Sequence, residues 1–329
     1  MSMAADHPKF PAKIARLITD WPLLPLGVLL IGLIGILQIM QPGVVTEPWL
    51  GNTVKFAIPL AMLAACQTLT MLTGGIDLSA GTVATITAFV TAFVTATLTP
   101  LIGAPEAVMI ALSCALLTGL LNGFGVAICR VHPLIMTLGS GLIVTGCRLV
   151  CQRFVISTGT KIPDVLVWLG TGRSFGVPNG LALFVPFAAL LIWGQRRTGF
   201  GRLLYAVGSN EAAARLSGVR VWQVHLALYA LSGLIAGLTG LLYLGLVKTA
   251  SLSLALPLDL PSVAAAVIGG TSLFGGRGGY GGTIIGALIL TVLATMLTLM
   301  QIPEGGRRIL FGLIILAVTA LNIRLTDRS

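Results

Sequence analysis

Residues 208–218 read Gly-Ser-Asn-Glu-Ala-Ala-Ala-Arg-Leu-Ser-Gly and form a polar stretch between two apolar halves of the chain. Ser209 or Asn210 can cap a short helix here, because their side-chain oxygens accept hydrogen bonds from the first free backbone N–H groups. Glu211 falls in the first turn, four residues before Arg215, which suits both the helix dipole and an ion pair one turn apart. The stretch therefore predicts a helix of about two turns.

The predicted helix ends before Gly218, and Ala212 and Leu216 share one of its faces. A helix this short is not stable alone in water, so it must pack against its own protein or against a partner. An ordinary surface helix between two membrane spans is the simpler alternative. The sequence on either side decides between the two.

Composition identifies the class of protein. The chain of 329 residues is 56% hydrophobic and 9% charged, with a mean hydropathy of +1.00. Soluble domains carry about 25% charged residues, so this is a polytopic membrane protein. The net charge of +10 comes mostly from lysines and arginines in loops and at span ends, where the cytoplasmic face of a membrane protein collects them. No basic run is interleaved with aromatic residues, so we expect no nucleic-acid partner.

Apolar segments of about 20 residues, the length that crosses a bilayer, predict about ten spans with both termini on one side. These segments are 23–40, 54–73, 79–99, 106–129, 134–151, 181–195, 223–247, 260–274, 282–300 and 308–323. Basic residues concentrate in the tail 1–22, the central loop 196–222 and the tail 324–329, so the positive-inside rule places all three in the cytoplasm. The segment 260–274 is short enough to be re-entrant instead. We expect an all-α transmembrane bundle, a single domain over 1–329, with broken helices.

Two glycine-rich breaks interrupt the apolar pattern. The first reads Thr-Gly-Gly-Ile-Asp-Leu-Ser-Ala-Gly at 73–81, and the second reads Gly-Gly-Thr-Ser-Leu-Phe-Gly-Gly-Arg-Gly-Gly at 269–279. Backbone that is broken at membrane depth must be satisfied by protein or by a water-filled cavity, and in transporters such breaks mark the substrate path. Tight turns at the membrane surface, which use the conformational freedom of glycine, explain the same pattern. Both interpretations stay open.

Polar residues beside the breaks are the candidates for a translocation path. Asp77 precedes an apolar run, where it is either a helix cap or a functional group near membrane depth. Asn122 lies in a Gly-x-x-x-Gly span and either bonds a neighbouring helix or faces the path. The same spacing recurs at 233–237 and 282–286, which indicates close helix packing. The candidate path residues are Gly74, Gly75, Asp77, Ser79, Asn122, Gly270, Thr271 and Ser272.

No catalytic or metal-binding pattern fits its context. Residues 172–176 match the G-x-S-x-G hydrolase pattern around Ser174, but Val177-Pro178 follows instead of a helix. The five cysteines lie mostly in apolar segments and indicate core residues rather than metal ligands. No lysine follows a glycine, so a phosphate-binding loop is absent. We expect no catalytic residue, no metal and no cofactor bound by this chain.

Taken together, the polar stretch and the two breaks resemble a known family. The chain looks like the membrane permease subunit of a bacterial ABC importer of the ribose/xylose/arabinose/galactose type, related to branched-chain amino-acid permeases. The resemblance covers the chain from about Leu23 to Arg324. It rests on four stretches in family-like order and spacing, Gly74–Ser79, Thr198–Arg202, Gly208–Gly218 and Gly269–Leu273, extended by Gly282–Leu290.

The resemblance implies a machine of several chains in the bacterial inner membrane, with both permease termini in the cytoplasm. Two permease subunits, identical or paired with a sister subunit, enclose the path. A periplasmic binding protein delivers a monosaccharide, and a cytoplasmic ATPase, usually one chain with two nucleotide-binding halves, binds ATP and magnesium. The short central helix then resembles the coupling helix that docks on this ATPase. Its residues are Asn210, Glu211, Ala212, Arg215, Leu216 and Gly218.

Other functions stay open. Another small polar solute, such as a sugar-derived signal, a polyol or an amino acid, fits the same machinery. The loop 153–178 departs from the usual family pattern, which leaves the sugar and the binding protein open. A stand-alone channel or secondary transporter belongs to another class, but Asp77 is nearly the only ionisable candidate within the spans. A membrane hydrolase built on Ser174 is a remote third.

Overall fold

The computed structural model describes residues 23–98, 103–158, 161–251, 253–303, 305–314 and 316. Apart from one hairpin of two short strands, the elements of this part of the chain are helices, in agreement with the expected all-α class. The tails 1–22 and 324–329 and residues 317–323 of the last candidate span lie outside the described residues. Nothing in the structure therefore bears on the predicted position of the termini.

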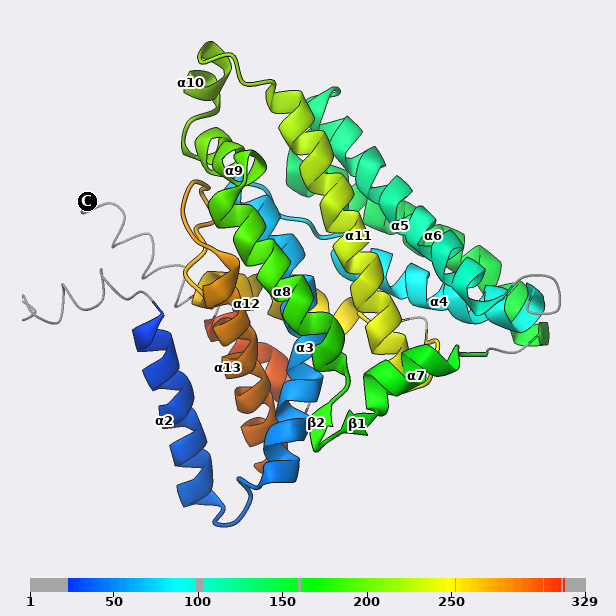
Figure 1. Ribbon diagram of the computed structural model, residues 1–329, viewed down its shortest axis with the longest axis vertical. Coiled ribbons are helices and arrows are strands. Elements are labelled where there is room, and N and C mark those ends of the chain that lie inside the picture. The colour runs from blue at the N-terminus through cyan, green and yellow to red at the C-terminus, as the bar shows by residue number, and fades with distance from the viewer. Residues whose placement is uncertain are drawn as a thin grey trace, which may run out of the picture.

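Long helices dominate the N-terminal half (Figure 1). They are α2 (Leu24–Met40), α3 (Glu47–Leu72), α4 (Ala80–Leu98), α5 (Ala104–Ala127) and α6 (Pro133–Thr158). The start of α3 shows how local sequence sets a boundary. The Thr46 hydroxyl accepts a hydrogen bond from Trp49 N at 3.4 Å, and Pro48 occupies the first turn, where its missing N–H costs nothing.

The C-terminal half contains more short helices than the N-terminal half. Its elements are α7 (Asp164–Thr171), β1 (Arg173–Ser174), β2 (Val177–Pro178), α8 (Gly180–Arg197), α9 (Gly199–Ser209), α10 (Glu211–Leu216), α11 (Val221–Val247), the 3₁₀ turn η1 (Leu256–Leu258), α12 (Asp259–Ile268) and α13 (Tyr280–Leu299). The short helices α9, α10 and α12 stand between long ones. They coincide with the polar stretch and the second glycine-rich break.

Six helices of the described chain are long and apolar enough to cross a membrane, namely α3, α4, α5, α6, α11 and α13. α2 is apolar but has only 17 residues, and the 18 residues of α8 end in Arg196 and Arg197. The structure thus shows a polytopic helical protein. It does not confirm the predicted count of ten spans.

The prediction of a continuous segment over 260–274 is wrong. α12 ends at Ile268 and has ten residues, which makes it about 15 Å long, half the thickness of the apolar core of a bilayer. Gly269 closes the helix, and Gly270 has a φ of +87°, in the left-handed region that favours glycine. The segment is a half-helix, which fits the re-entrant alternative, and re-entry itself stays a prediction.

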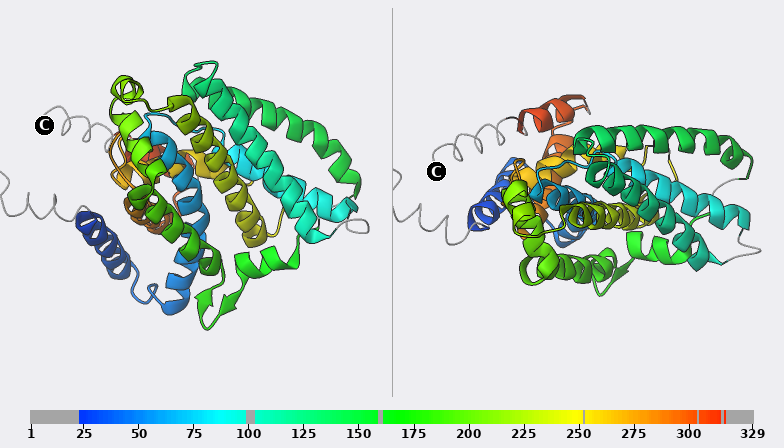
Figure 2. Two further views of the ribbon diagram at one scale, coloured as in Figure 1. Left: turned by 45° about the horizontal axis from the view of Figure 1, so that its top comes forward. Right: turned by 90° about the horizontal axis from the view of Figure 1, so that it is seen from above.

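α11 is the central helix. It packs on α3, α4, α5 and α7, and the view from above places it between α8 on one side and α4 to α6 on the other (Figure 2). A Cβ on Gly119 of α5 would overlap the backbone of α11, and one on Gly233 of α11 would overlap the backbone of α5. Gly282 and Gly286 of α13 lie against α12 in the same way. These contacts confirm the close packing that the glycine spacing predicted.

The molecule has two distinct ends (Figure 1). α10 lies at one end, and the β1–β2 hairpin with α7 lies near the other. We call them the α10 end and the hairpin end. α3, α5 and α8 finish at the α10 end, whereas α11 begins there.

Candidate functional site

α10 is held by local interactions. Asn210 caps it, because its Oδ1 accepts a hydrogen bond from the backbone N three residues on at 2.9 Å. Arg215 donates to Glu211 Oε1 through Nε at 3.1 Å and Nη2 at 2.6 Å, and both side chains are about half exposed. Gly218, with a φ of +84°, donates its N–H to Arg215 O at 3.0 Å and ends the helix. The structure shows the cap, the ion pair and the end that the sequence predicted.

The two faces of α10 differ. Ala214 is buried against the rest of the chain, whereas 91% of the surface of Leu216 is exposed. Ala212 is exposed beside it. Ala212 and Leu216 thus form a small apolar face of α10 that the described residues leave exposed. α10 is therefore fixed at its base and free on its outer face.

The base of α10 is a junction of three segments: the end of α3, the end of α9 and the second glycine-rich break. Gly276 N donates to Leu72 O at 2.9 Å, and a Cβ on Gly208 would overlap the same oxygen. Tyr205 Oη donates to Gly278 O at 2.8 Å. Burial raises the pKa of the Tyr205 phenol, so the hydroxyl keeps its proton and remains a donor. Backbone touches backbone here, so the three segments are mechanically joined.

The first glycine-rich break reaches the same junction. Gly74 has a φ of +77°, and a Cβ on it would lie 3.6 Å from Phe274 O. A Cβ on Gly275, whose φ is +91°, would lie 3.1 Å from Gly74 N. Both breaks, far apart in sequence, therefore meet at the base of α10.

The other end of the first break is held by a buried group that we call the Asp77 cluster. Asp77 Oδ1 accepts hydrogen bonds from Ser79 N at 3.0 Å and Ser79 Oγ at 2.6 Å, and Oδ2 accepts from Ser232 Oγ of α11 at 2.6 Å. Asn122 Nδ2 of α5 donates to Ser79 Oγ at 2.9 Å. Three candidate path residues, Asp77, Ser79 and Asn122, thus contact one another and are at most 2% exposed.

Backbone contacts fix the same loop. Gln67 of α3 donates Nε2 to Asp77 O at 2.7 Å and accepts from Asp77 N at Oε1 at 3.3 Å. Thr137 Oγ1 of α6 accepts from Leu78 N at 3.1 Å. Helices α3, α5, α6 and α11 therefore converge on residues 77–79. Broken backbone that is buried away from water needs such partners.

The Asp77 cluster lies near the middle of the bundle. Ser232 stands eleven residues after Val221, the first residue of the 27-residue α11, and hence about 16 Å along its axis. The first break therefore runs from the α10 end to the middle of the bundle, which excludes a simple surface turn for its Asp77 end. Asp77 Oδ1 also accepts from Ser79 N in the turn just before α4 begins, so Asp77 supports the start of this helix without being its N-cap residue.

Sequence reasoning missed a second acidic residue at the start of α4. Asp259, the first residue of α12, accepts a hydrogen bond from Gly81 N at 2.6 Å, and a Cβ on Gly81 would overlap its Oδ1. An isolated carboxylate in an apolar stretch identified Asp77 in the sequence. The same feature identifies Asp259, which is the only carboxylate between Glu211 and Glu304. Two acidic side chains thus satisfy the free N–H groups of one buried helix start.

The remaining path candidates lie in the second break. Ser272 Oγ accepts a hydrogen bond from Phe274 N at 3.2 Å. Thr271 is buried, and its Oγ1 has no hydrogen-bond partner within the described part of the chain. No hydrogen bond among the described residues joins Gly270, Thr271 or Ser272 to the Asp77 cluster. The candidate path residues thus form two groups.

Replacing Ser232 with alanine tests the link between the Asp77 cluster and α11. The change removes a buried hydrogen bond to a carboxylate, worth about 1.5–3 kcal/mol, so the unfolding midpoint of the purified protein in detergent should fall by several degrees. Ser113→Ala is the matched control, because Ser113 Oγ bonds an exposed carbonyl one turn back in α5. Equal midpoints for the two variants would show that Ser232 does not hold the cluster.

Ser174 does not have the geometry of a hydrolase nucleophile. β1 and β2 pair as an antiparallel hairpin whose turn residues, Phe175 and Gly176, have φ values of +53° and +80°. A nucleophile elbow needs a strand followed by a helix, so the G-x-S-x-G match is due to chance. Within the described residues, no three His, Cys, Asp or Glu side chains form a group that could hold a metal ion.

Comparison with known proteins agrees with the sequence resemblance. The family model of the branched-chain amino acid transport system permease component matches residues 50–319. The ribose import permease protein RbsC of Escherichia coli K12 is 35% identical over 296 residues, which cover 89% of this chain and 91% of RbsC. No solved structure matches the chain significantly.

Two further relatives are named for the import of other solutes. The fructose import permease protein FrcC of Rhizobium meliloti is 33% identical over 276 residues, covering 80% of this chain and 74% of FrcC. The autoinducer 2 import system permease protein LsrC of Escherichia coli O9:H4 is 32% identical over 270 residues, covering 81% and 76%. With its apolar helices, its broken segments and these relatives, the chain belongs to the branched-chain amino acid transport system permease family and is a membrane permease of the ABC sugar-importer type.

Proposed function

We propose that this chain passes a monosaccharide from a periplasmic binding protein to the cytoplasm, driven by a separate ATPase. The observation that carries the proposal is the position of α10. Its outer face presents the exposed Leu216, and at its base Gly208 touches the end of α3 and the second glycine-rich break, which in turn touches Gly74 of the first. A partner that moves α10 would therefore move the segments that bracket the middle of the bundle.

Few contacts separate α10 from the middle of the bundle, so a movement of α10 can be transmitted there. α9 links α8 to α10, and Thr198 caps it by accepting a hydrogen bond from Gly201 N at 3.1 Å. The contact of Gly74 with the second break passes a displacement of α9 into the loop that ends at the Asp77 cluster. That cluster sets the start of α4. ATP-driven motion at α10 is thereby converted into a change at half the depth of the bundle.

This role implies a location for α10 and a set of partner proteins. We place α10 and the loop 196–222 in the cytoplasm, together with both termini, in a single permease domain. The ATPase, with two nucleotide-binding halves, binds ATP and magnesium, so this chain needs neither. A second permease subunit, identical or a sister, completes the path. The ribose and fructose that name two of the relatives support a small hydroxyl-rich solute.

Reversing the charge of Glu211 tests the coupling role. Glu211→Lys replaces the ion pair with repulsion of Arg215 and puts a cation at the positive end of α10. We expect ATP-driven uptake into membrane vesicles to fall about tenfold, which corresponds to about 1.4 kcal/mol of coupling, while the amount of protein in the membrane stays unchanged.

The matched control is Glu106→Lys, which changes another exposed glutamate in the first turn of a helix, α5, away from the α10 end. It should leave uptake unaltered. Wild-type uptake by Glu211→Lys, or an equal loss in both variants, would remove α10 from the coupling role.

The signal autoinducer 2 is the second candidate solute, because the relative named for its import is about as similar as those named for ribose and fructose. Vesicles that contain the permease and its ATPase, supplied with the binding protein, should be tested with labelled ribose, fructose and galactose. Uptake of any of these supports the monosaccharide. Uptake of none, with uptake of the signal, would favour the second candidate.

A further inference from the structure

A cavity that we call the α13 pocket lies between the end of α8, α9 and the start of α13, beside the second glycine-rich break. Its volume is about 500 Å³, within the range of small-molecule sites, roughly 300–1,000 Å³. Gln195 and Arg196 of α8 and Tyr205 of α9 line it, together with Gly278–Gly282. None of the described residues in its wall is a carboxylate.

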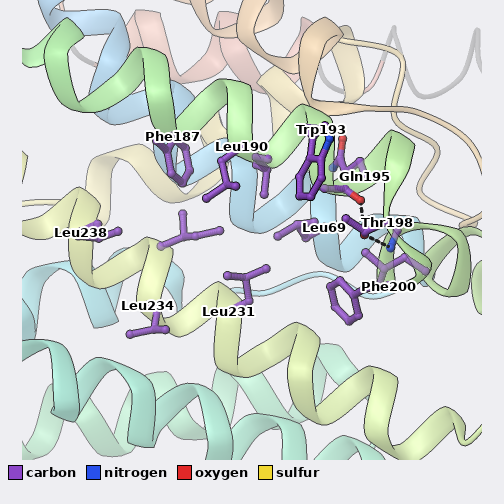
Figure 3. Close-up of a pocket in the computed structure, with 15 residues that line it drawn as sticks. Leu69, Phe187, Leu190, Trp193, Gln195, Thr198, Phe200, Leu231, Leu234 and Leu238 are labelled. Carbon is purple, nitrogen blue, oxygen red and sulfur yellow. Dashed lines mark hydrogen bonds between the residues drawn. The ribbon is translucent and has the colours of Figure 1, made fainter.

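Gln195 borders two cavities, and its amide group reaches toward the α13 pocket. Figure 3 shows Gln195 at one end of the apolar groove between α8 and α11, whose wall includes Leu190 and Leu231. Its Oε1, however, accepts a hydrogen bond from Tyr280 N at 3.0 Å, which brings the amide to the first residue of α13. Because a backbone N–H only donates, this bond fixes Oε1 toward Tyr280 and leaves Nε2 as the free end of the amide.

The free end of the Gln195 amide is a buried donor without an acceptor. Only 5% of the surface of Gln195 is exposed, and its Nε2 forms no hydrogen bond within the described part of the chain. An unpaired buried donor is costly, and such groups are normally satisfied by protein, water or a ligand. An acceptor oxygen is therefore expected beside Nε2.

The start of α13 offers further donors to the same pocket. This helix has 20 residues, and its first turn presents free backbone N–H groups and the positive end of the helix dipole. Gln195 accepts from Tyr280 N, whereas Gly281 N makes no hydrogen bond within the described residues. A helix start in this state suits an anion.

Arg196 adds a positive charge to the pocket. Its exposed side chain belongs to the wall, and among the described residues no carboxylate pairs with it. Burial raises the pKa of the Tyr205 phenol, and the guanidinium of Arg196 opposes that rise, so the two side chains are close. Donors from α8 and α13 thus border one space. A phosphate group, with oxygens in several directions, can accept from all of them.

Water reaches this part of the molecule. Arg196 and Gly278, both in the wall of the pocket, are exposed. The neighbouring helices α9 and α10 carry the exposed charges of Arg202, Glu211 and Arg215. Charged side chains are costly in hydrocarbon, so the α10 end lies in water whichever side of the membrane it faces. A soluble ligand can therefore enter.

We propose that the α13 pocket binds the phosphate group of a small, soluble phosphate ester. The phosphate oxygens accept hydrogen bonds from Gln195 Nε2, Gly281 N and Arg196, and the rest of the ester fills the volume beside Ile192 and Ile268. A bound ester joins the end of α8 to the start of α13. The inference goes beyond the proposed function and depends on neither the transported solute nor the ATPase.

The test is isothermal titration calorimetry of the full chain, purified without its companions because an ATPase itself binds phosphate groups. The probe is glycerol 3-phosphate at constant ionic strength, with glycerol as the blank. Gln195→Glu keeps the acceptor for Tyr280 N but replaces the free NH₂ group with a carboxylate oxygen, which repels phosphate. Arg196→Gln removes the charge. Arg197→Gln is its matched control, because Arg197 is also exposed in α8 but lies outside the wall of the pocket.

A fourth variant fills the pocket. Gly279 has a φ of 172°, an extended conformation that any residue adopts, and a Cβ on it would lie 3.7 Å from Tyr205 Oη, an ordinary contact. Gly279→Val should therefore fold and occupy the space of the ligand. Gly199→Val is the matched control at the start of α9, where nothing lies within 4 Å of a Cβ. The unfolding midpoint of each variant checks its fold.

Wild type, Arg197→Gln and Gly199→Val should each bind one glycerol 3-phosphate per chain and no glycerol. Gln195→Glu and Arg196→Gln should bind it at least tenfold more weakly, and Gly279→Val should not bind it. Absence of binding by wild type would overturn the proposal, because water alone would then fill the pocket. So would unchanged binding by Gln195→Glu.

Equal losses in Arg196→Gln and Arg197→Gln would also overturn the proposal, because general attraction of anions to a chain with a net charge of +10 explains them. Binding of phosphatidic acid in place of glycerol 3-phosphate would do the same, because the ligand would then be a lipid. None of these readouts involves transport, so failure of this proposal is distinguishable from failure of the proposed function.

Discussion

Replacing Asp77 with alanine should leave little folded protein in the membrane. The change removes the acceptor of three buried donors, Ser79 N, Ser79 Oγ and Ser232 Oγ, and we expect a loss of about 3 kcal/mol or more. Such a loss is a large part of the stability of a typical domain. The measurement is the yield of monodisperse protein after detergent extraction, followed by its unfolding midpoint.

Asp77→Asn separates folding from charge. The amide keeps one acceptor oxygen, and the hydroxyl of Ser232 can rotate to accept from the new NH₂ group. We expect this variant to fold better than the alanine variant, with a midpoint between that variant and wild type. If Asp77→Ala extracts and unfolds like wild type, the Asp77 cluster does not hold the first break.

Replacing Leu216 with aspartate should abolish docking of the ATPase without affecting the fold. Leu216 is 91% exposed, so the permease itself loses no buried contact. If α10 docks on the ATPase as proposed, however, the new charge would enter the contact between the two proteins. Central contacts of this kind cost at least about 2 kcal/mol when disrupted, so co-purification of the ATPase and ATP-driven uptake should both fall about thirtyfold or more.

Phe175→Asp is the matched control for Leu216→Asp. Phe175 is fully exposed at the tip of the β1–β2 hairpin, near the opposite end of the molecule. The same change from an apolar to an acidic side chain there should leave the ATPase bound. If Leu216→Asp retains the ATPase, or if Phe175→Asp loses it, then α10 is not the docking element.

Interactions between residues that are close in sequence predicted α10 well. Its cap at Asn210, its ion pair from Glu211 to Arg215 and its end at Gly218 each depend on residues at most four positions apart. Such interactions are visible in a sequence because the helix itself brings the partners together. The exposed state of Leu216 was not visible, because it depends on the absence of a long-range neighbour within the described chain.

The Asp77 cluster was predicted only in part. Glycines and a carboxylate in an apolar context identified residues 74–79, but the partners Gln67, Thr137 and Ser232 are unremarkable polar residues inside long helices. Only the tertiary arrangement of α3, α6 and α11 selects them. Asp259 was missed although its isolation in the sequence resembles that of Asp77.

The structure does not confirm the ten spans that hydropathy predicts, and one of the predicted segments is a half-helix for a physical reason. Apolar residues fill half-helices and their connecting loops as well as full spans, because both are buried in the bundle. The segment 260–274 shows this, since α12 stops at Ile268 and the apolar residues after it belong to the turn. Glycine at positive φ, as at Gly270 and Gly275, was the better indicator of where the chain reverses.

The central claim is that α10 docks on the ATPase, and a photo-crosslinker placed at Leu216 tests it most directly. The tagged permease should be irradiated in its native membrane, and the crosslinked partner identified by mass spectrometry. If α10 is the coupling helix, position 216 captures a protein with phosphate-binding loops, and the same probe at position 175 does not. Capture of that ATPase from position 175, or from neither position while the ATPase still co-purifies, would contradict the coupling role.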